Sequence, residues 1–386
     1  MTLLAPPLSI YVHLPWCVRK CPYCDFNSHV APPELPQARY IDCLLEDLEH
    51  DLQWVNGREI HSIFFGGGTP SLFAPDEIAR FIDGVKKYVR VGAELEVTME
   101  ANPGTIEHGR FAGYRAAGVT RISLGAQTFD DRQLQLLGRI HSGDQVVVAV
   151  DELRTAGFLN FNLDLMYGLP EQSLEQALAD VERAIALGPT HLSHYQLTLE
   201  PGTVFYHQPP PLPDDDTTWA MQVECQARLA ASGFDQYEVS AYARADHQCR
   251  HNLNYWRFGD YLGLGAGAHG KFTDAQANRI WRTVRLKQPR EYLASNAVTR
   301  LAETNVVAAL ELPFEFMLNA LRLRSGFTTS LFVRHTGLPP HAISAPLNEA
   351  IRLGLIASPQ KDSWVPTDHG RRFLNNLQAL FLAQND

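Results

Sequence analysis

The sequence has few cysteines, a deficit of basic residues and no long apolar run. Six cysteines in 386 residues exclude a disulfide-stapled secreted scaffold, because such scaffolds are small and cysteine-dense. The 33 Lys and Arg against 43 Asp and Glu give a net charge of −10, which predicts no nucleic-acid partner. No apolar run approaches the ~18 residues of a membrane helix, and the first ten residues lack the basic segment of a signal peptide. These absences predict a cytoplasmic protein.

Short apolar runs alternate with amphipathic segments through the first two-thirds of the chain. Six such β–α units in a row indicate a parallel sheet with right-handed crossovers, either an open Rossmann-like sheet or a barrel. No G-x-G-x-x-G is followed by an acidic residue ~20 positions on, so a dinucleotide-binding fold has no support. The expected strands are 8–13, 59–65, 94–100, 119–124, 158–165 and 191–199. The expected helices include 36–52, 76–89, 143–156 and 173–187, with Asp76 and Asp144 as N-caps.

The expected strands carry an unusual number of polar residues. Parallel strands that are covered on both faces read as continuous apolar runs, and a closed barrel fills its interior with branched apolar side chains. Here the third and fifth strands alternate instead. Their polar positions are Glu94, Glu96, Thr98 and Glu100 in the third and Asn160, Asn162 and Asp164 in the fifth. This alternation predicts a partial barrel around a wet cavity, with Glu94 and Glu96 exposed near the strand start.

The composition changes after residue 205. A proline-rich segment at 209–213 reads as an extended linker or as an ordered loop, followed by a helix N-terminus. From about residue 305 we expect helices at 306–324, 330–336 and 342–353, strands at 355–358 and 364–366, and a last helix from Asp368. This pattern predicts a winged-helix-like module over 305–386. Seven Lys and Arg against six Asp and Glu in this stretch favour a structural role over DNA binding.

Three cysteines directly follow the first expected strand, in the pattern C-x-x-x-C-x-x-C. Cys17, Cys21 and Cys24 can surround one compact metal site. A structural zinc site needs a fourth ligand, for which Asp25 or His29 is close enough in sequence. Three thiolates on an iron–sulfur cluster leave one iron open to an outside ligand. The spacing favours the cluster over zinc, and both over three buried structural thiols.

This loop resembles the cluster loop of the radical S-adenosylmethionine (SAM) superfamily. The resemblance implies a [4Fe–4S] cluster on Cys17, Cys21 and Cys24, with SAM chelating the open iron. It also implies the fold, namely an α/β partial (β/α)6 radical SAM barrel over 1–205. The connecting region would span 206–304, and the winged-helix-like α+β domain 305–386.

Polar or glycine-rich segments follow the expected strands, at the edge where barrels carry their chemistry. A glycine triplet such as 66–68 can be a plain tight turn, or it can allow close approach of the backbone to a ligand. Physically, Glu100 or Asp164 suits an ammonium group or ribose hydroxyls, and Arg139 suits a carboxylate. The positions that the resemblance places at SAM, in part at a second SAM molecule, are Tyr11, Tyr23, Gly67, Gly68, Thr69, Glu100, Gln127, Arg139 and Asp164.

The resemblance extends nearly end to end and is nearest to the oxygen-independent coproporphyrinogen III oxidase group. Within that group the chain resembles the HemW-type heme chaperones. Phe26 stands where the oxidase has a further cysteine, and the N-terminal extension of the oxidase has no counterpart. The segment from Tyr23 to His29 is typical of the chaperone branch.

A second motif, H-N-x-x-Y-W, spans His251 to Trp256 and is implicated in heme binding in this branch. Neutral imidazole is a common axial ligand of heme iron, so His251 is the expected ligand, with His247 and Cys249 as rivals. Tyr255 and Trp256 offer flat faces to a porphyrin. Arg250 or Arg257 could pair with its propionates.

The expected function is that of a heme chaperone, whose partners are heme and acceptor hemoproteins, including respiratory ones at the membrane surface. The resemblance also admits a homodimer. The main alternative is a radical SAM enzyme that oxidises a porphyrinogen. A winged-helix regulator with a redox-sensing cluster is disfavoured by the near-neutral C-terminal module. No catalytic residue is assigned.

Overall fold

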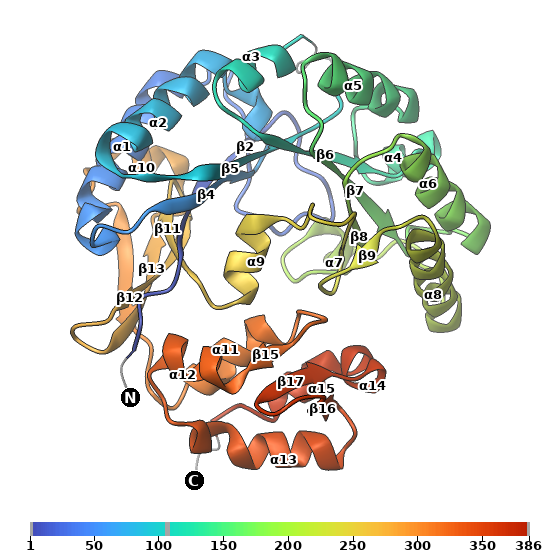
Figure 1. The fold of residues 1–386 in the computed structure, drawn as a ribbon. Coiled ribbons are helices and arrows are strands. Elements are labelled where there is room, and N and C mark those ends of the chain that lie inside the picture. The colour runs from blue at the N-terminus through green and yellow to red at the C-terminus, as the bar shows by residue number, and fades with distance from the viewer. Residues whose placement is uncertain (1–2, 105–108, 384–386) are drawn as a thin grey trace.

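The computed structural model describes residues 3–104 and 109–383, and its centre is an open arc of parallel strands. In sheet order the arc runs through β1 (Leu8–Leu14), β4 (Ile60–Gly67), β5 (Val91–Ala101), β6 (Arg121–Gln127), β7 (Phe161–Tyr167) and β8 (His191–Gln196). Figure 1 shows the arc with its helices outside and its inner face open on one side. The predicted partial (β/α)6 barrel is therefore confirmed.

Amphipathic helices cover the outside of the arc and bury the main hydrophobic core against it. They are α1 (Gln37–Val55), α2 (Pro75–Tyr88), α3 (Phe111–Ala116), α4 (Asp131–Leu136), α5 (Gly143–Thr155), α6 (Leu174–Ala186) and α8 (Asp215–Ala231). The predicted N-caps Asp76 and Asp144 are wrong. Ala74 and Ser142 hold those places, and each aspartate lies further on, in the first helical turn. Ser142 is the N-cap of α5 because its hydroxyl and Gln145 form a reciprocal capping box.

Strands from the expected connecting region lengthen the sheet at both ends. At one end β11 (Asp260–Leu264) pairs in parallel with β1 and is followed by β12 (His269–Asp274), β13 (Arg279–Arg285) and β14 (Leu301–Val306). At the other, β10 (Ala241–Ala243) and β9 (Asp235–Gln236) follow β8. The result is a 12-stranded sheet. A division at residue 205 thus separates strands that belong to one sheet.

Three short segments pack around the arc. The proline-rich segment is an ordered loop rather than a free linker, because the carbonyl of Pro211 accepts a hydrogen bond of 2.9 Å from the amide of Glu171. It connects α7 (Val204–His207) to α8. Helix α9 (Arg250–Trp256) lies in the opening of the arc (Figure 1) and packs against β4 and β1. Helix α10 (Pro289–Ala294) packs on α1.

The C-terminal domain has its own hydrophobic core and lies across the opening of the arc (Figure 1). Its helices are α11 (Leu312–Ala320), α12 (Thr329–Thr336), α13 (Ser344–Arg352), α14 (Asp368–Arg372) and α15 (Leu374–Ala379). Its three-stranded sheet has the order β15 (Phe327–Thr328), β17 (Ser363–Pro366), β16 (Ile356–Ala357). The helix expected from residue 306 begins only at Leu312, because Val306 pairs with Trp281 as the last residue of β14. No helix in the two described ranges is long and apolar enough to cross a membrane.

Candidate functional site

The cysteine loop is closed at its base by a small strand pair. β2 (Trp16–Cys17) pairs in parallel with β3 (His29–Val30), so Cys17 lies beside Val30. The amide of Ala31 donates to the carbonyl of Cys17 at 2.9 Å. The thiols of Cys17, Cys21 and Cys24 are partly exposed at the carboxyl end of β1. The loop therefore presents three free thiols at the edge of the barrel where parallel strands end.

The three loop thiols are not gathered as tightly as the ligands of one zinc ion. In a tetrahedral zinc site with Zn–S bonds of about 2.3 Å, the sulfur atoms lie roughly 3.8 Å apart. Among the described residues, one group of three His, Cys, Asp or Glu side chains has its ligand atoms within 4.8 Å of one another, namely Glu96, Cys249 and His251. The three loop thiols therefore do not all lie within 4.8 Å of one another. His29 Nε2 contacts Asn27 Oδ1 at 3.2 Å, and His29 is not part of a tight ligand group with the thiols. Burial raises the pKa of the Cys17 and Cys24 thiols, so a bound cluster would have to supply the positive charge that favours their thiolate forms.

A cavity of about 480 Å³ lies beside the thiols, inside the barrel mouth. It brings together most of the residues that the sequence placed at SAM. Its walls include Cys17, Cys21, Tyr23, Cys24, Gly67, Gly68, Thr69, Glu100, Gln127, Arg139 and Asp164. Tyr11 lies elsewhere: it lines an adjoining cavity, and its hydroxyl contacts His13 Nδ1 at 2.7 Å.

The glycine run after β4 allows the backbone to touch the cysteine loop. Gly67 has a φ of +112°, and a Cβ there would lie 2.6 Å from the His13 ring. A Cβ on Gly68 would lie 2.5 Å from the carbonyl oxygen of Trp16. The amide of Thr69 donates to that same carbonyl at 2.7 Å. These glycines are therefore required by close approach, and a side chain at either position would push β4 away from the thiols.

Arg139 connects the loop to the strand ends. Its Nη1 lies 3.7 Å from Cys21 Sγ, and its Nη2 donates to the carbonyl of Gly125 at 2.9 Å and to Asn102 Oδ1. Asn102 in turn donates to Thr69 Oγ1 at 3.0 Å. The Arg139 Nε is buried without a partner among the described residues. A fixed cation with a spare donor beside the cluster loop suits an anionic group of a cofactor.

Two residues that the sequence analysis gave no role also shape this cavity. Asn102 orients Arg139, as described above. Tyr195 donates a 2.7 Å hydrogen bond to Gln127 Oε1 and lines the cavity from β8. The sequence could have indicated Tyr195, because it stands two positions after Ser193 near a strand end and so lies on the same face of that strand.

Two partly exposed carboxyl groups, those of Glu100 and Asp164, line the cavity. Burial, reinforced by the nearby Asp164, raises the pKa of Glu100 to about 8, although the amide of Gly67 opposes this by donating to Glu100 Oε2 at 3.2 Å. Burial also raises the pKa of Asp164, against hydrogen bonds from Ser193, Asn162 and Ser123. Neither carboxyl forms an ion pair within the described part of the chain, so this part of the cavity favours a cationic ligand.

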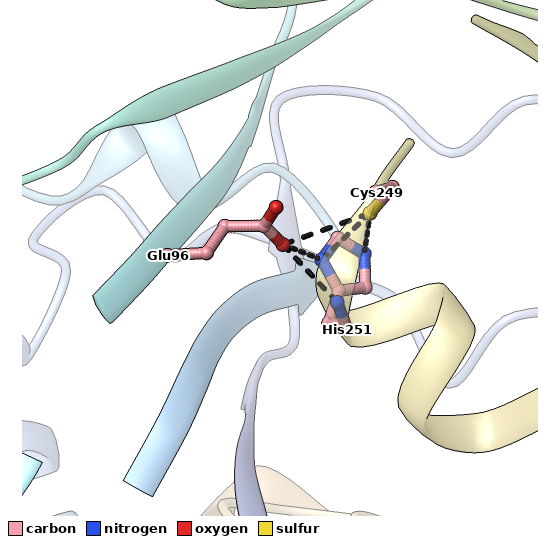
Figure 2. Close-up of side chains that lie close together, drawn as sticks. All are labelled: Glu96, Cys249 and His251. Atoms are coloured by element: carbon pink, nitrogen blue, oxygen red, sulfur yellow. Dashed lines mark hydrogen bonds and ion pairs between the residues drawn. The ribbon is translucent and has the colours of Figure 1, made fainter. Parts of the chain in front are cut away.

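The expectation that Glu96 is exposed is wrong. Its side chain is 8% exposed and accepts hydrogen bonds from the amides of Arg250 at 3.0 Å and His251 at 3.1 Å. It therefore caps the N-terminus of α9, where Cys249 provides no side-chain cap. Figure 2 shows Glu96 reaching from β5 toward Cys249 and His251. Glu94, as expected, is exposed and pairs with Arg250.

The imidazole of His251 is enclosed. It is 4% exposed, its Nδ1 lies 2.9 Å from Glu96 Oε1, and its ring stacks on Phe64 with centroids 4.2 Å apart. Cys249 Sγ lies 3.0 Å from its Nδ1 and 3.3 Å from its Nε2 (Figure 2). Ligation of heme iron by His251 stays a prediction. In this arrangement the ring anchors α9, and His251 lines neither the cavity beside the thiols nor the one beside Tyr11.

The open barrel, the three-cysteine loop and the C-terminal domain define a radical SAM protein. Residues 11–184 match the family model of the Radical SAM superfamily, and residues 307–373 match that of the HemN C-terminal domain. This superfamily implies a [4Fe–4S] cluster and SAM. In fold the chain is similar to Escherichia coli coproporphyrinogen III oxidase (HemN), with a TM-score of 0.81 and 23% identity over 98% of this chain and 90% of that one.

Full-length relatives give the narrower family. The heme chaperone HemW of Escherichia coli is 48% identical over 379 residues, which cover 98% of this chain and 99% of the relative. HemW of Haemophilus influenzae is also 48% identical, over 383 residues with the same coverage. The chain belongs to the HemW family.

The raised pKa of Glu100 predicts how SAM binding depends on pH. A cationic ligand favours the carboxylate form, but below about pH 8 the carboxyl is mostly protonated. SAM affinity should therefore rise between pH 6 and 8 by up to about tenfold per pH unit, then level off, with proton release on binding at pH 7. Calorimetric titration in two buffers of different ionisation enthalpy measures both effects. Glu100→Gln should abolish the pH dependence, whereas the control Glu94→Gln should keep it; a flat wild-type profile would contradict the assignment.

Proposed function

We propose that this protein is a cytoplasmic heme chaperone, which binds heme and passes it to acceptor hemoproteins on a scaffold that carries a [4Fe–4S] cluster and SAM. The acceptors would include respiratory hemoproteins at the membrane surface, and the working form could be a homodimer. The family supports heme handling, since the full-length relatives are named heme chaperones. Cys17, Cys21 and Cys24 would hold the cluster.

One observation carries the proposal. A second cavity of about 800 Å³ adjoins the cluster cavity, and its walls are rich in aromatic side chains. Tyr255 and Trp256, the last two residues of the H-N-x-x-Y-W motif, form part of its wall. Ligand cavities of this size, with mostly apolar walls and a few polar groups, suit a large flat cofactor. Phe26, which replaces a cysteine of the oxidase pattern, lines both cavities.

The test separates a chaperone from an oxidase. Anaerobically reconstituted protein should bind heme stoichiometrically in an absorbance titration and transfer it to an apo-hemoprotein. It should not consume coproporphyrinogen in the presence of SAM and dithionite. His369→Ala, a change at an exposed histidine of α14 in the C-terminal domain, provides a control for nonspecific heme binding and should behave as wild type. Porphyrinogen consumption combined with weak heme binding would overturn the chaperone function in favour of the enzyme alternative.

A further inference from the structure

The aromatic cavity lies directly beside the cluster cavity. Six residues line both: Asp25, Phe26, Ser28, Gly67, Glu100 and Trp256. The remaining wall comes from segments far apart in sequence, namely β1, the end of β4, α9 and the β11–β12 turn. A ligand in this cavity would therefore contact the cluster loop on one side and α9 on the other.

The walls of this cavity present flat apolar faces, and two of the aromatic residues also carry a buried, unpaired polar atom. Phe26, which lines this cavity, is 58% exposed to solvent. Tyr255 packs edge-on against Tyr261 with ring centroids 4.8 Å apart. Tyr255 Oη and Trp256 Nε1 are buried and have no hydrogen-bond partner among the described residues. These two atoms are enclosed by protein, so a ligand in the cavity would contact the aromatic ring faces rather than the polar tips.

Two lysines at the rim of the cavity have no carboxylate partner. Lys20 Nζ lies 3.3 Å from the carbonyl of Phe26 and 3.4 Å from that of Ser28. Lys287 is exposed. Neither forms an ion pair with any acidic side chain in the part of the chain that the structure describes. Two ammonium groups at the rim suit a ligand that carries two carboxylates.

Three imidazoles line the cavity, and one of them has no hydrogen-bond partner among the described residues. Both ring nitrogens of His13 have hydrogen-bond partners. Nδ1 lies 2.7 Å from Tyr11 Oη, and Nε2 lies 2.9 Å from the carbonyl oxygen of Asn27. His29 contacts Asn27 Oδ1 through Nε2 at 3.2 Å. The ring of His269, at the start of β12, is exposed and makes no hydrogen bond to a described residue. Partial burial and the charges of Lys287 and Arg282 lower the pKa of His269, which favours the neutral imidazole.

From this arrangement we infer that the aromatic cavity is the heme site, with His269 as an axial ligand of the iron and Lys20 and Lys287 pairing with the propionates. This inference rests on the proposed heme-chaperone function. His251 is then a positioning residue. Its bond to Glu96 and its stacking on Phe64 hold α9 so that Tyr255 and Trp256 face the porphyrin. Neutral imidazole is a suitable ligand for heme iron.

Ligand exchange at the iron tests the assignment of His269. Loss of an outer-shell partner alone costs metal sites about 10- to 100-fold in affinity, so His269→Ala should weaken ferric heme binding by at least about tenfold. It should also change the Soret band and the electron paramagnetic resonance signal, and added imidazole should restore both. His269→Met should give a different spectrum again, which a purely structural role would not produce. Cluster content and thermal unfolding of each variant verify that it folds.

His251→Ala is the matched comparison. It should weaken heme binding through displacement of α9, yet the heme that binds should keep the wild-type axial-ligand spectrum. If His251→Ala loses that spectrum while His269→Ala keeps it, the inference is overturned and the iron ligand is His251. If the wild type itself fails to bind heme stoichiometrically, the proposed function fails first. The two failures are therefore distinguishable.

The propionate contacts have a separate test. The double variant Lys20→Gln/Lys287→Gln should bind heme several-fold more weakly than wild type, with an unchanged axial-ligand spectrum. The dimethyl ester of heme, which lacks the two charges, should bind wild type and double variant equally. Lys87→Gln, at the end of α2, is the charge-matched control. Equal loss of affinity for heme and for its dimethyl ester would contradict the pairing.

Discussion

Cys21→Ala is expected to abolish the iron–sulfur cluster. In a [4Fe–4S] cluster held by three cysteines each thiolate binds a different iron, so the two thiolates that remain would leave two irons without a protein ligand. Arg139, which lies 3.7 Å from Cys21 Sγ, would then face an empty corner. After anaerobic reconstitution, iron and sulfide content should fall to background, and the visible absorbance of the iron–sulfur cluster should disappear.

Cys225→Ala is the matched control, because it also removes one thiol. Cys225 is buried in α8, away from the loop. This variant should keep its full cluster content, since a small core cavity costs stability but removes no ligand. Wild-type iron and sulfide in Cys21→Ala would contradict the cluster assignment, and equal losses in both variants would point to misfolding rather than ligation.

Asp260→Asn is expected to destabilise the barrel strongly. Asp260 lies at the start of β11 and is fully buried, with Lys271 Nζ 2.8 Å from its Oδ1 and Arg58 Nη1 2.7 Å from its Oδ2. The amide of Thr273 also donates to it, at 2.7 Å. Removing the carboxylate leaves the buried Lys271 ammonium without its counter-charge, which should lower the free energy of unfolding by about 3–5 kcal/mol. Urea unfolding followed by tryptophan fluorescence measures the loss.

A second substitution identifies the cause of that loss. Lys271→Met in the Asp260→Asn background removes the uncompensated charge and should recover part of the lost stability. Glu349→Gln breaks an ion pair at the surface of α13 and should leave the unfolding midpoint close to wild type, because exposed pairs contribute little. If Asp260→Asn behaves like Glu349→Gln, the buried pair does not stabilise the joint between β11 and the rest of the sheet.

The class of fold and the cluster loop could both be predicted from the amino-acid sequence. Both are local signals: period-two and period-3.6 patterns mark the strands and helices of the arc, and three cysteines within eight residues mark the loop. The carboxyl ends of parallel strands meet at one rim, so the order of the strands alone groups Gly67, Glu100, Gln127 and Asp164 there. All four line the cavity beside the thiols.

Features that depend on contacts between distant parts of the chain became apparent in the folded protein and not before. Glu96 reads as an exposed strand residue, yet it caps a helix whose first residue is 154 positions away. His251 reads as an open ligand but is enclosed by that same contact, whereas His269, which the motif does not include, faces the aromatic cavity. Strand β11 pairs directly with β1, although the other barrel strands lie between the two in the sequence. No local pattern encodes this pairing. Periodicity reports which face of an element is buried, but the partner on that face is set by the packing of the entire chain.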